Sequence, residues 1–189
     1  MARNSLLADW AGYITSGTIG SGVTFPAGHI RQVVSSRFDT SNSTDSNSTT
    51  YIKAYLSSAY HWTGQITDVL ASSKVLITMS FGVYVARDST IESGWGYSIV
   101  RDNTETPNST SGTSIEDFGN CDFFHHNNTI ENGHMAIGTK VSLTVLDSTP
   151  DTGTNNYYLA HKVSSTAATL GVNSYSSAPF ICIMQEILV

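Results

Sequence analysis

The sequence predicts an all-β protein, an antiparallel two-sheet β-sandwich of jelly-roll type. The first observation is the run of residues 74–87, in which apolar side chains fill every second position. Successive side chains of a strand point to opposite faces, so this spacing makes one continuous apolar face, which no helix would produce. The second observation is that strand-like stretches and turns recur at short intervals, with no helical stretch of any length between them.

The run of residues 74–87 is the strand around which the rest of the chain is organised. Small or polar residues fill most of its alternate positions, and Gly82 is the expected place for a bulge or bend. We expect the side that carries Tyr84 to meet another subunit. The apolar positions, which we expect to be buried within a single chain, are Val75, Ile77, Met79, Phe81, Val83 and Val85.

The other elements follow from the same alternation and from the polar stretches that separate the strands. In the first strand, Ile30 and Val34 are expected to face inward. The last strand is apolar on both faces, which suits burial on both sides or pairing between subunits. The predicted strands are residues 29–34, 51–56, 74–87, 94–100, 134–137, 140–146, 157–163 and 180–189. Residues 60–69 are predicted to form either a further strand or an irregular connection. The predicted loops, rich in Ser, Thr, Asn and Asp, are residues 35–50, 101–114 and 147–156.

Residues 1–28 are expected to form an N-terminal arm, and residues 29–189 the sandwich domain. The arm has a short helical pattern at residues 5–11 and a Gly-rich run at residues 16–22, and it can bury little core of its own. Ordering such an arm costs entropy that a partner must offset, so we expect it to anchor the protein in an assembly. Neither a signal peptide nor a membrane partner is expected, because no apolar run approaches the necessary length.

Charge and cysteine content narrow the environment of the protein. Charged residues make up 13% of the chain, and its net charge is −6 with only nine Lys and Arg. Such a composition resembles secreted or virion β proteins more than cytosolic enzymes. Binding to nucleic acid needs clustered Lys and Arg, so no nucleic-acid partner is expected. We expect Cys121 and Cys182 to be buried or free thiols rather than a disulfide, since a bacterial cytoplasm keeps thiols reduced.

The segment that follows residue 120 holds the candidate metal ligands. Thiolate, carboxylate and imidazole groups are donors that metal ions use in proteins. Adjacent histidines point to opposite faces of an extended chain, however, so one strand cannot present both to a single ion. We therefore expect no metal and no cofactor, although one histidine could meet its copies on a trimer axis. The candidate ligands are Cys121, Asp122, His125, His126 and His134.

Acidic residues supply the candidate catalytic groups. Glu116 and Asp117 are adjacent, and Glu131 stands alone further along the chain. A glycosidase needs two carboxylates that flank the scissile bond. The simpler interpretation is that these charges keep loops and edge strands soluble. No nucleophile elbow, phosphate loop or His-Glu-x-x-His motif occurs, so no catalytic residue and no enzyme activity are expected.

Glu186 and the aromatic residues are the remaining candidates. Glu186 stands among apolar residues, so it is either exposed on the outer face of a sheet or buried with a partner such as Arg31 or Lys162. Aromatic rings could line a glycan-binding patch, although core or subunit interface is their commoner role. These aromatics are Tyr55, Tyr60, Trp62, Tyr84, Trp95, Tyr157 and Tyr158. The Asn-x-Ser/Thr sequons, which mark surface loops and little more, begin at Asn42, Asn47, Asn108 and Asn127.

Five short blocks occur in a fixed order along the chain. They are residues 25–34 (FPAGHIRQVV), 71–77 (ASSKVLI), 101–104 (RDNT), 146–152 (LDSTPDT) with 156–158 (NYY), and 181–187 (ICIMQEI). In this order they resemble a domain of structural proteins of tailed bacteriophages, of the marine and cyanobacterial phage type. The last block departs from the family's pattern, because Gln185 separates Met184 from Glu186. The register of the final strand therefore does not follow from the resemblance.

The resemblance implies a noncatalytic virion component, commonly a homotrimer, that is assembled in the host bacterial cytoplasm. Because the chain is short and has neither a shaft repeat nor coiled-coil heptads, the first hypothesis is a capsid decoration or short head fibre. The arm would attach it to other virion proteins of the capsid or tail. The alternative is a tail-fibre or tail-tip subunit that binds the host cell surface, with a surface glycan as a candidate ligand. A surface polysaccharide hydrolase is a third and weaker hypothesis.

Overall fold

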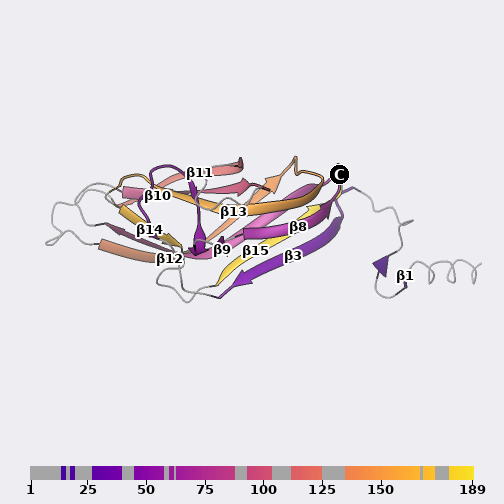
Figure 1. The fold of residues 1–189 in the computed structure, drawn as a ribbon, viewed down its shortest axis with the longest axis horizontal. Coiled ribbons are helices and arrows are strands. Elements are labelled where there is room, and N and C mark those ends of the chain that lie inside the picture. Colours follow the sequence, from indigo (N-terminus) through magenta and orange to yellow (C-terminus); the bar gives the residue numbers. More distant parts are fainter. Residues whose placement is uncertain are drawn as a thin grey trace, which may run out of the picture.

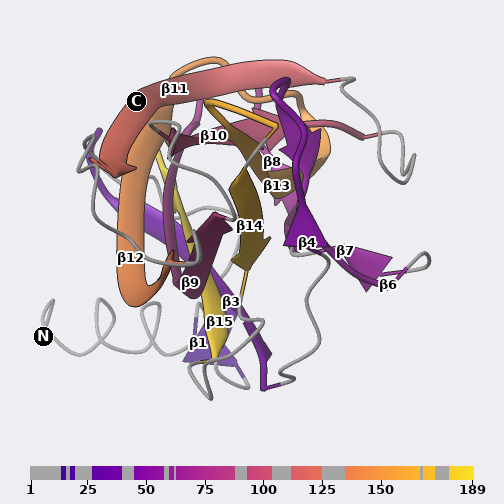
Figure 2. The same ribbon diagram turned by 90° about the vertical axis from the view of Figure 1, so that its left-hand side faces the viewer.

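A computed structural model of the chain confirms the antiparallel two-sheet β-sandwich (Figures 1 and 2). The residues that it describes are 14–15, 18–19, 27–39, 45–57, 60–61, 63–87, 93–103, 112–124, 135–166, 168–172 and 179–189. No helix that could span a membrane occurs among them. Most of the predicted arm at residues 1–28 lies outside these ranges, so its boundary and anchoring role stay predictions. The strands that belong to neither sheet are β1 (Ile14–Thr15), β2 (Thr18–Ile19), β6 (Tyr55–Ser57) and β7 (Tyr60–His61).

The smaller sheet has five strands, and β13 lies at its centre. One side of β13 pairs with β10, and the other side pairs with β8 and then β5. β11 pairs with β10 and forms the edge of the sheet. The bounds of these strands are β5 (Ile52–Lys53), β8 (Thr63–Val69), β10 (Ser93–Arg101), β11 (Thr113–Phe124) and β13 (Gly153–Val163).

The larger sheet has six strands and is built around β9, the predicted central strand, whose bounds match the prediction. One side of β9 pairs along its length with β12, which forms an edge. The other side pairs first with β15 and then with β14, and β3 lies outside β15. The bounds of these strands are β3 (Ile30–Phe38), β4 (Asp45–Ser46), β9 (Lys74–Arg87), β12 (Met135–Asp147), β14 (Ala168–Val172) and β15 (Phe180–Ile187).

The apolar face of β9 forms the middle of the core between the two sheets. The predicted burial of alternate residues is confirmed from Val75 to Val83, all at most 2% exposed, while the side chain of Val85 lies outside the described part. Phe81 meets Tyr97 of the opposite sheet edge-on, with ring centroids 5.2 Å apart. Such contacts combine burial of large apolar areas with favourable ring geometry, and they join the two sheets.

The prediction of one exposed loop over residues 35–50 is wrong at its beginning. Residues 35–38 continue β3 and pair with β15 in register, with Phe38 opposite Phe180. These two rings lie 6.0 Å apart at the margin of the core. The polar residues of this stretch are tolerated in a strand because β15, distant in sequence, supplies the hydrogen-bonding partner.

Two local predictions within the strands are also wrong. Ile30 is 52% exposed instead of inward, because a register shift opposite Glu186 and Ile187 turns the first residue of β3 outward. Val34, beyond the shift, packs against the core as expected. Gly82 makes no bulge, since the register of β9 and β12 is unbroken. Gly82 instead lies where the other partner of β9 changes from β15 to β14.

Three further differences concern where strands begin and what they bury. β11 and β14 were not expected as strands, and both depend on pairing with distant segments. The loops at residues 101–114 and 147–156 are shorter than predicted, because β11 and β13 begin within them. β15 is not buried on both faces within one chain: Met184 is fully buried, whereas Ile183 is 36% exposed. Its pairing between subunits stays a prediction.

Candidate functional site

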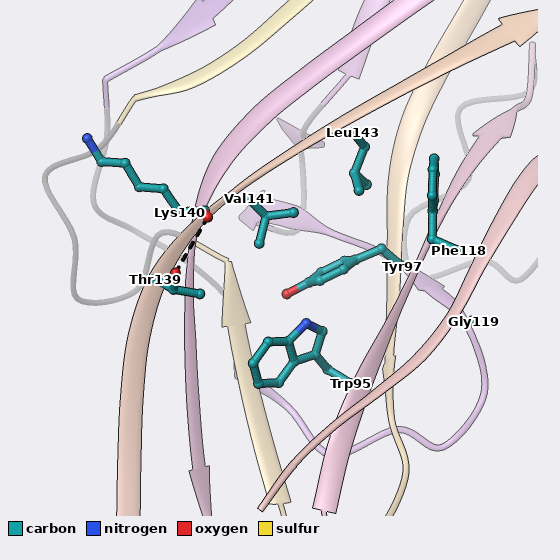
Figure 3. A pocket seen from close by; sticks show the side chains of 8 residues that line it. All are labelled: Trp95, Tyr97, Phe118, Gly119, Thr139, Lys140, Val141 and Leu143. Carbon is teal, nitrogen blue, oxygen red and sulfur yellow. Dashed lines mark hydrogen bonds between the residues drawn. The ribbon is translucent and has the colours of Figure 1, made fainter.

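A groove lies between the edge strands of the two sheets (Figure 3). It has a volume of about 290 Å³. Residues from β10 and β11 form one wall, and residues from β12 form the other. The lining residues are Trp95, Tyr97, Phe118, Gly119, Thr139, Lys140, Val141 and Leu143.

The groove exists because the two sheets do not close on this side. Among the described strands, β11 pairs only with β10, and β12 pairs only with β9. Trp95 and Tyr97 alternate along β10 and point inward, each 4% exposed, so they form the floor. Figure 3 shows both rings directed towards Val141 of β12, with the amine of Lys140 pointing away from them.

The lining is apolar and rich in rings. Phe118 is 37% exposed at the rim, while Leu143 is nearly buried. Lys140 is the one charged residue of the lining, and no carboxylate belongs to it. The volume is near the lower limit of about 300 Å³ for ligand pockets, so the groove fits an apolar or ring-shaped group rather than a large polar ligand.

Asp117, one of the two candidate catalytic carboxylates, braces the wall of the groove. The hydroxyl of Tyr51 donates to its carboxylate, and the N–H of Gly119 does the same at 2.8 Å. These two hydrogen bonds, that from Tyr51 first, lower the pKa of Asp117. Glu116, also on β11, is exposed and does not line the groove. Glu131 lies outside the described residues.

Glu186 is buried with Arg31, one of the two partners proposed for it. Its Oε2 accepts hydrogen bonds from Arg31 Nη1 at 2.6 Å and from Gln32 at 2.7 Å, and its Oε1 accepts from the N–H of Leu70 at 2.9 Å. Burial raises the pKa of Glu186, but these bonds outweigh it and the pKa is lowered. The Nζ atom of the other proposed partner, Lys162, lies over the ring of Tyr51, 4.2 Å from the ring centroid.

A second charged cluster at an end of the sandwich was not expected from the sequence. Arg101 forms an ion pair with buried Asp147, and the Tyr157 hydroxyl donates to the same carboxylate at 2.8 Å. Burial lowers the pKa of Arg101, but Asp147 raises it further, so the net change is upward. Nearby, fully buried Lys53 forms an ion pair with Asp102. The signal in the sequence that could have predicted this cluster is that Arg101 and Asp147 each directly follow an apolar strand.

His161 is a buried polar residue that the sequence reasoning also missed. It lies opposite Tyr97 in the β10–β13 register and is 1% exposed. Neither ring nitrogen has a hydrogen-bond partner among the described residues. Burial lowers the pKa of His161 to about 4, so the ring is neutral at pH 7. Its place in the alternation of Tyr157, Leu159 and Val163 was the signal for an inward side chain.

The described aromatic candidates favour the core role over a glycan-binding patch. Tyr157 and Tyr158 are core residues, at most 1% exposed, and Tyr84 is half-buried. Trp95 does line the groove, but its companions there are Tyr97 and Phe118, which were not among the candidates. The side chains of Tyr55, Tyr60 and Trp62 lie outside the described part, so nothing tests them.

The candidate metal ligands stay mostly untested. Cys121 and Asp122 belong to β11, but their side chains are not described, and His125, His126 and His134 lie outside the described residues. The described part of the chain holds no group of three or more His, Cys, Asp or Glu residues placed to bind a metal.

The structure describes the side chain of one of the two cysteines and one of the four sequon asparagines. Cys182 is a buried free thiol, and burial raises its pKa to about 12. It is therefore not joined to Cys121. Asn47 is exposed just after β4, as expected for a surface sequon. The other three sequons, at Asn42, Asn108 and Asn127, lie outside the described residues.

No known protein-family model and no curated protein sequence matches the chain. Solved structures give weak similarities. Dimeric latent PorU from Porphyromonas gingivalis is 12% identical, over 90% of this chain and 14% of that one, with a TM-score of 0.34. The VP2 subviral particle of infectious bursal disease virus is 8% identical, over 93% and 46%, with a TM-score of 0.25. The Gt strain of that virus is 9% identical, over 93% and 45%, with a TM-score of 0.23.

This chain spans less than half the length of each of these three proteins. Two of them are virus structures. TM-scores this low give no support to a functional conclusion, so the functional argument depends on the residues of this chain.

Proposed function

We propose that this protein is a noncatalytic structural protein of a tailed-phage virion, a homotrimeric capsid decoration or short head fibre. The observation that carries the proposal is that ion pairs join the resembling blocks to one another. Arg31 of the first block bonds Glu186 of the last. Arg101 of the third block bonds Asp147 of the fourth. Residues that carry the resemblance therefore hold distant strands together, which is the expected reason for such blocks to recur in a structural domain.

The environment of the buried carboxylates supports a structural role. Asp102, Asp147 and Glu186 are each at most 7% exposed, and each forms an ion pair with a cation of the same chain. A general acid or base must reach a substrate proton. Carboxylates that are enclosed and bonded in this way stabilise the fold instead.

The test is to locate the protein on the particle. Labelled antibody or electron microscopy of phage particles should place it on the head in multiples of three copies. Deletion of residues 1–24 should leave a folded protein that no longer attaches. A protein absent from purified particles would refute the virion role, and a truncated protein that still attaches would refute anchoring by the arm.

The alternative, a tail subunit that binds the host surface, is favoured by the groove. Trp95, Tyr97 and Phe118 present ring surfaces that could hold a sugar ring or an apolar group. Phe118→Ala should then weaken adsorption of the protein to host cells by about tenfold, whereas Glu116→Ala on the same strand should not. Tail location in the imaging experiment would support this alternative.

A further inference from the structure

The outer face of the six-stranded sheet carries exposed apolar side chains. The described residues include seven exposed large hydrophobic side chains, and four of them, Ile30, Val33, Leu146 and Ile183, lie on this face. The registers of the paired strands show which residues lie side by side on this face. Leu146 is opposite Leu76 on β9, which is opposite Gln185 on β15, which is opposite Val33 on β3. One apolar row with a single amide therefore crosses four strands.

The neighbouring row is also uncharged. It runs from Thr144 through Thr78 and Ile183 to Ser35. The hydroxyls of Thr78 and Thr144 lie 3.1 Å apart and bond each other. Hydroxyls both donate and accept, so such a row is complementary to a second copy of itself.

The charges of these strands explain which partner suits this face. The carboxylates of Asp147 and Glu186 point inward, and both are bonded within the chain. None of the outward residues in the rows named above is acidic, although the chain has 15 Asp and Glu and a net charge of −6. Two copies of an acidic protein repel each other through most surfaces, so two adjoining rows without carboxylates favour the approach of further copies there.

The size and regularity of the face match an interface. β9 and β12 pair without a register shift, so no bulge interrupts the surface. Usual strand spacing and rise give the face of these four strands a plan area of roughly 600 Å². A standard interface buries roughly 800 Å² on each partner, so the face has nearly the extent of one side of such an interface.

From these observations we infer that the outer faces of β3, β15, β9 and β12 from three copies of this chain pack together around one axis. The inference rests on the proposed function, because it names the surface through which the proposed homotrimer forms. Ile183 on β15 and Leu146 on the edge strand β12 are contacts between the copies, and the hydroxyl row lies in the interface.

Analytical ultracentrifugation of the full chain tests this surface with one matched pair of variants. Leu146→Lys places a charge on this face, on its edge strand β12. Leu70→Lys is the control, because Leu70 has the same 44% exposure but lies in the turn between β8 and β9. We expect Leu146→Lys to weaken self-association by about tenfold or more, and Leu70→Lys to leave it unchanged. Circular dichroism checks that both variants fold.

Leu146→Thr and Ile183→Thr give the same test with residues that suit a strand, should the lysine variant not fold. A wild-type protein that sediments as a single chain at every concentration would overturn both the homotrimer and this surface. A wild-type oligomer that Leu146→Lys and both threonine variants leave intact would overturn the surface alone. Equal weakening by Leu146→Lys and Leu70→Lys would also overturn it, since the effect would then be one of added charge.

Discussion

Two regions of the molecule differ in which side chains they bury and which they expose. The clusters around Glu186 and Asp147 bury charges, and each charge has a partner in the same chain. The outer face of the six-stranded sheet exposes apolar residues, such as Leu146 and Ile183, that have no covering element among the described residues. The first region makes a single chain stable, because a buried charge is tolerated only with its partner. The second is suited to a partner that a single chain does not supply.

The largest effect is expected where a buried charge loses its partner. Arg101→Ala leaves the carboxylate of Asp147 enclosed with the Tyr157 hydroxyl, and should lower the free energy of unfolding by about 3–5 kcal/mol at pH 7. Urea unfolding measures this. Arg37→Ala removes the exposed pair with Asp39 and should cost less than about 1 kcal/mol. Similar losses in both variants would show that the Asp147 cluster contributes no more than a surface pair.

A pH-dependent effect of similar size is expected at His161. The unfolded histidine binds a proton below pH 6.5, whereas the folded one does so only below about pH 4. The unfolded state therefore holds more protons in this window, and the wild type should lose stability as the pH falls through it. His161→Leu should not show this loss. At about pH 4 the loss in the free energy of unfolding that the wild type shows and His161→Leu lacks should reach about 3 kcal/mol.

Urea unfolding of both proteins between pH 7 and pH 4 measures the difference. His29→Leu, at an exposed position, is the control and should follow the wild type. Parallel pH profiles for wild type and His161→Leu would contradict the burial of a neutral imidazole.

A smaller pH-dependent effect is expected at Glu186, whose side chain is an acid whereas that of His161 is a base. Its folded pKa lies below the usual value of 4.5, so its stabilising contribution is present above pH 4.5 and is lost as the pH falls through the folded pKa. Glu186→Gln should lower the free energy of unfolding by about 2 kcal/mol at pH 7, a typical cost of losing hydrogen bonds to a charge. The deficit should shrink as the pH falls through the folded pKa. The exposed Glu116→Gln is the control, and a deficit that stays constant with pH would rule out the ionised cluster.

The smallest effect on the single chain is expected on the outer face. Leu146→Thr should change the free energy of unfolding by only about 0.5 kcal/mol, because the side chain is 44% exposed and threonine suits a strand. Thermal unfolding at a concentration where the chains are separate measures this. A large loss there would mean that Leu146 supports the fold itself, and the contrast between the two regions would fail.

The local pattern was enough to predict part of the fold. The strand at residues 74–87 and its buried face followed from alternation along one segment. β14 and the start of β11 did not, since their pairing partners are distant in the sequence. Phe118 became part of the groove only because β11 and β12 lie at the same side of the sandwich.

The sequence by itself determined the all-β class, the central strand and the face of that strand that is buried. These depend on side chains two residues apart, whose directions the backbone geometry sets. Only the tertiary structure decided that Glu186 is enclosed by Arg31 and Gln32, and that Leu146, Val33 and Ile183 share one outer face. Those relations arise from the register of strands far apart in the chain, which local pattern does not specify.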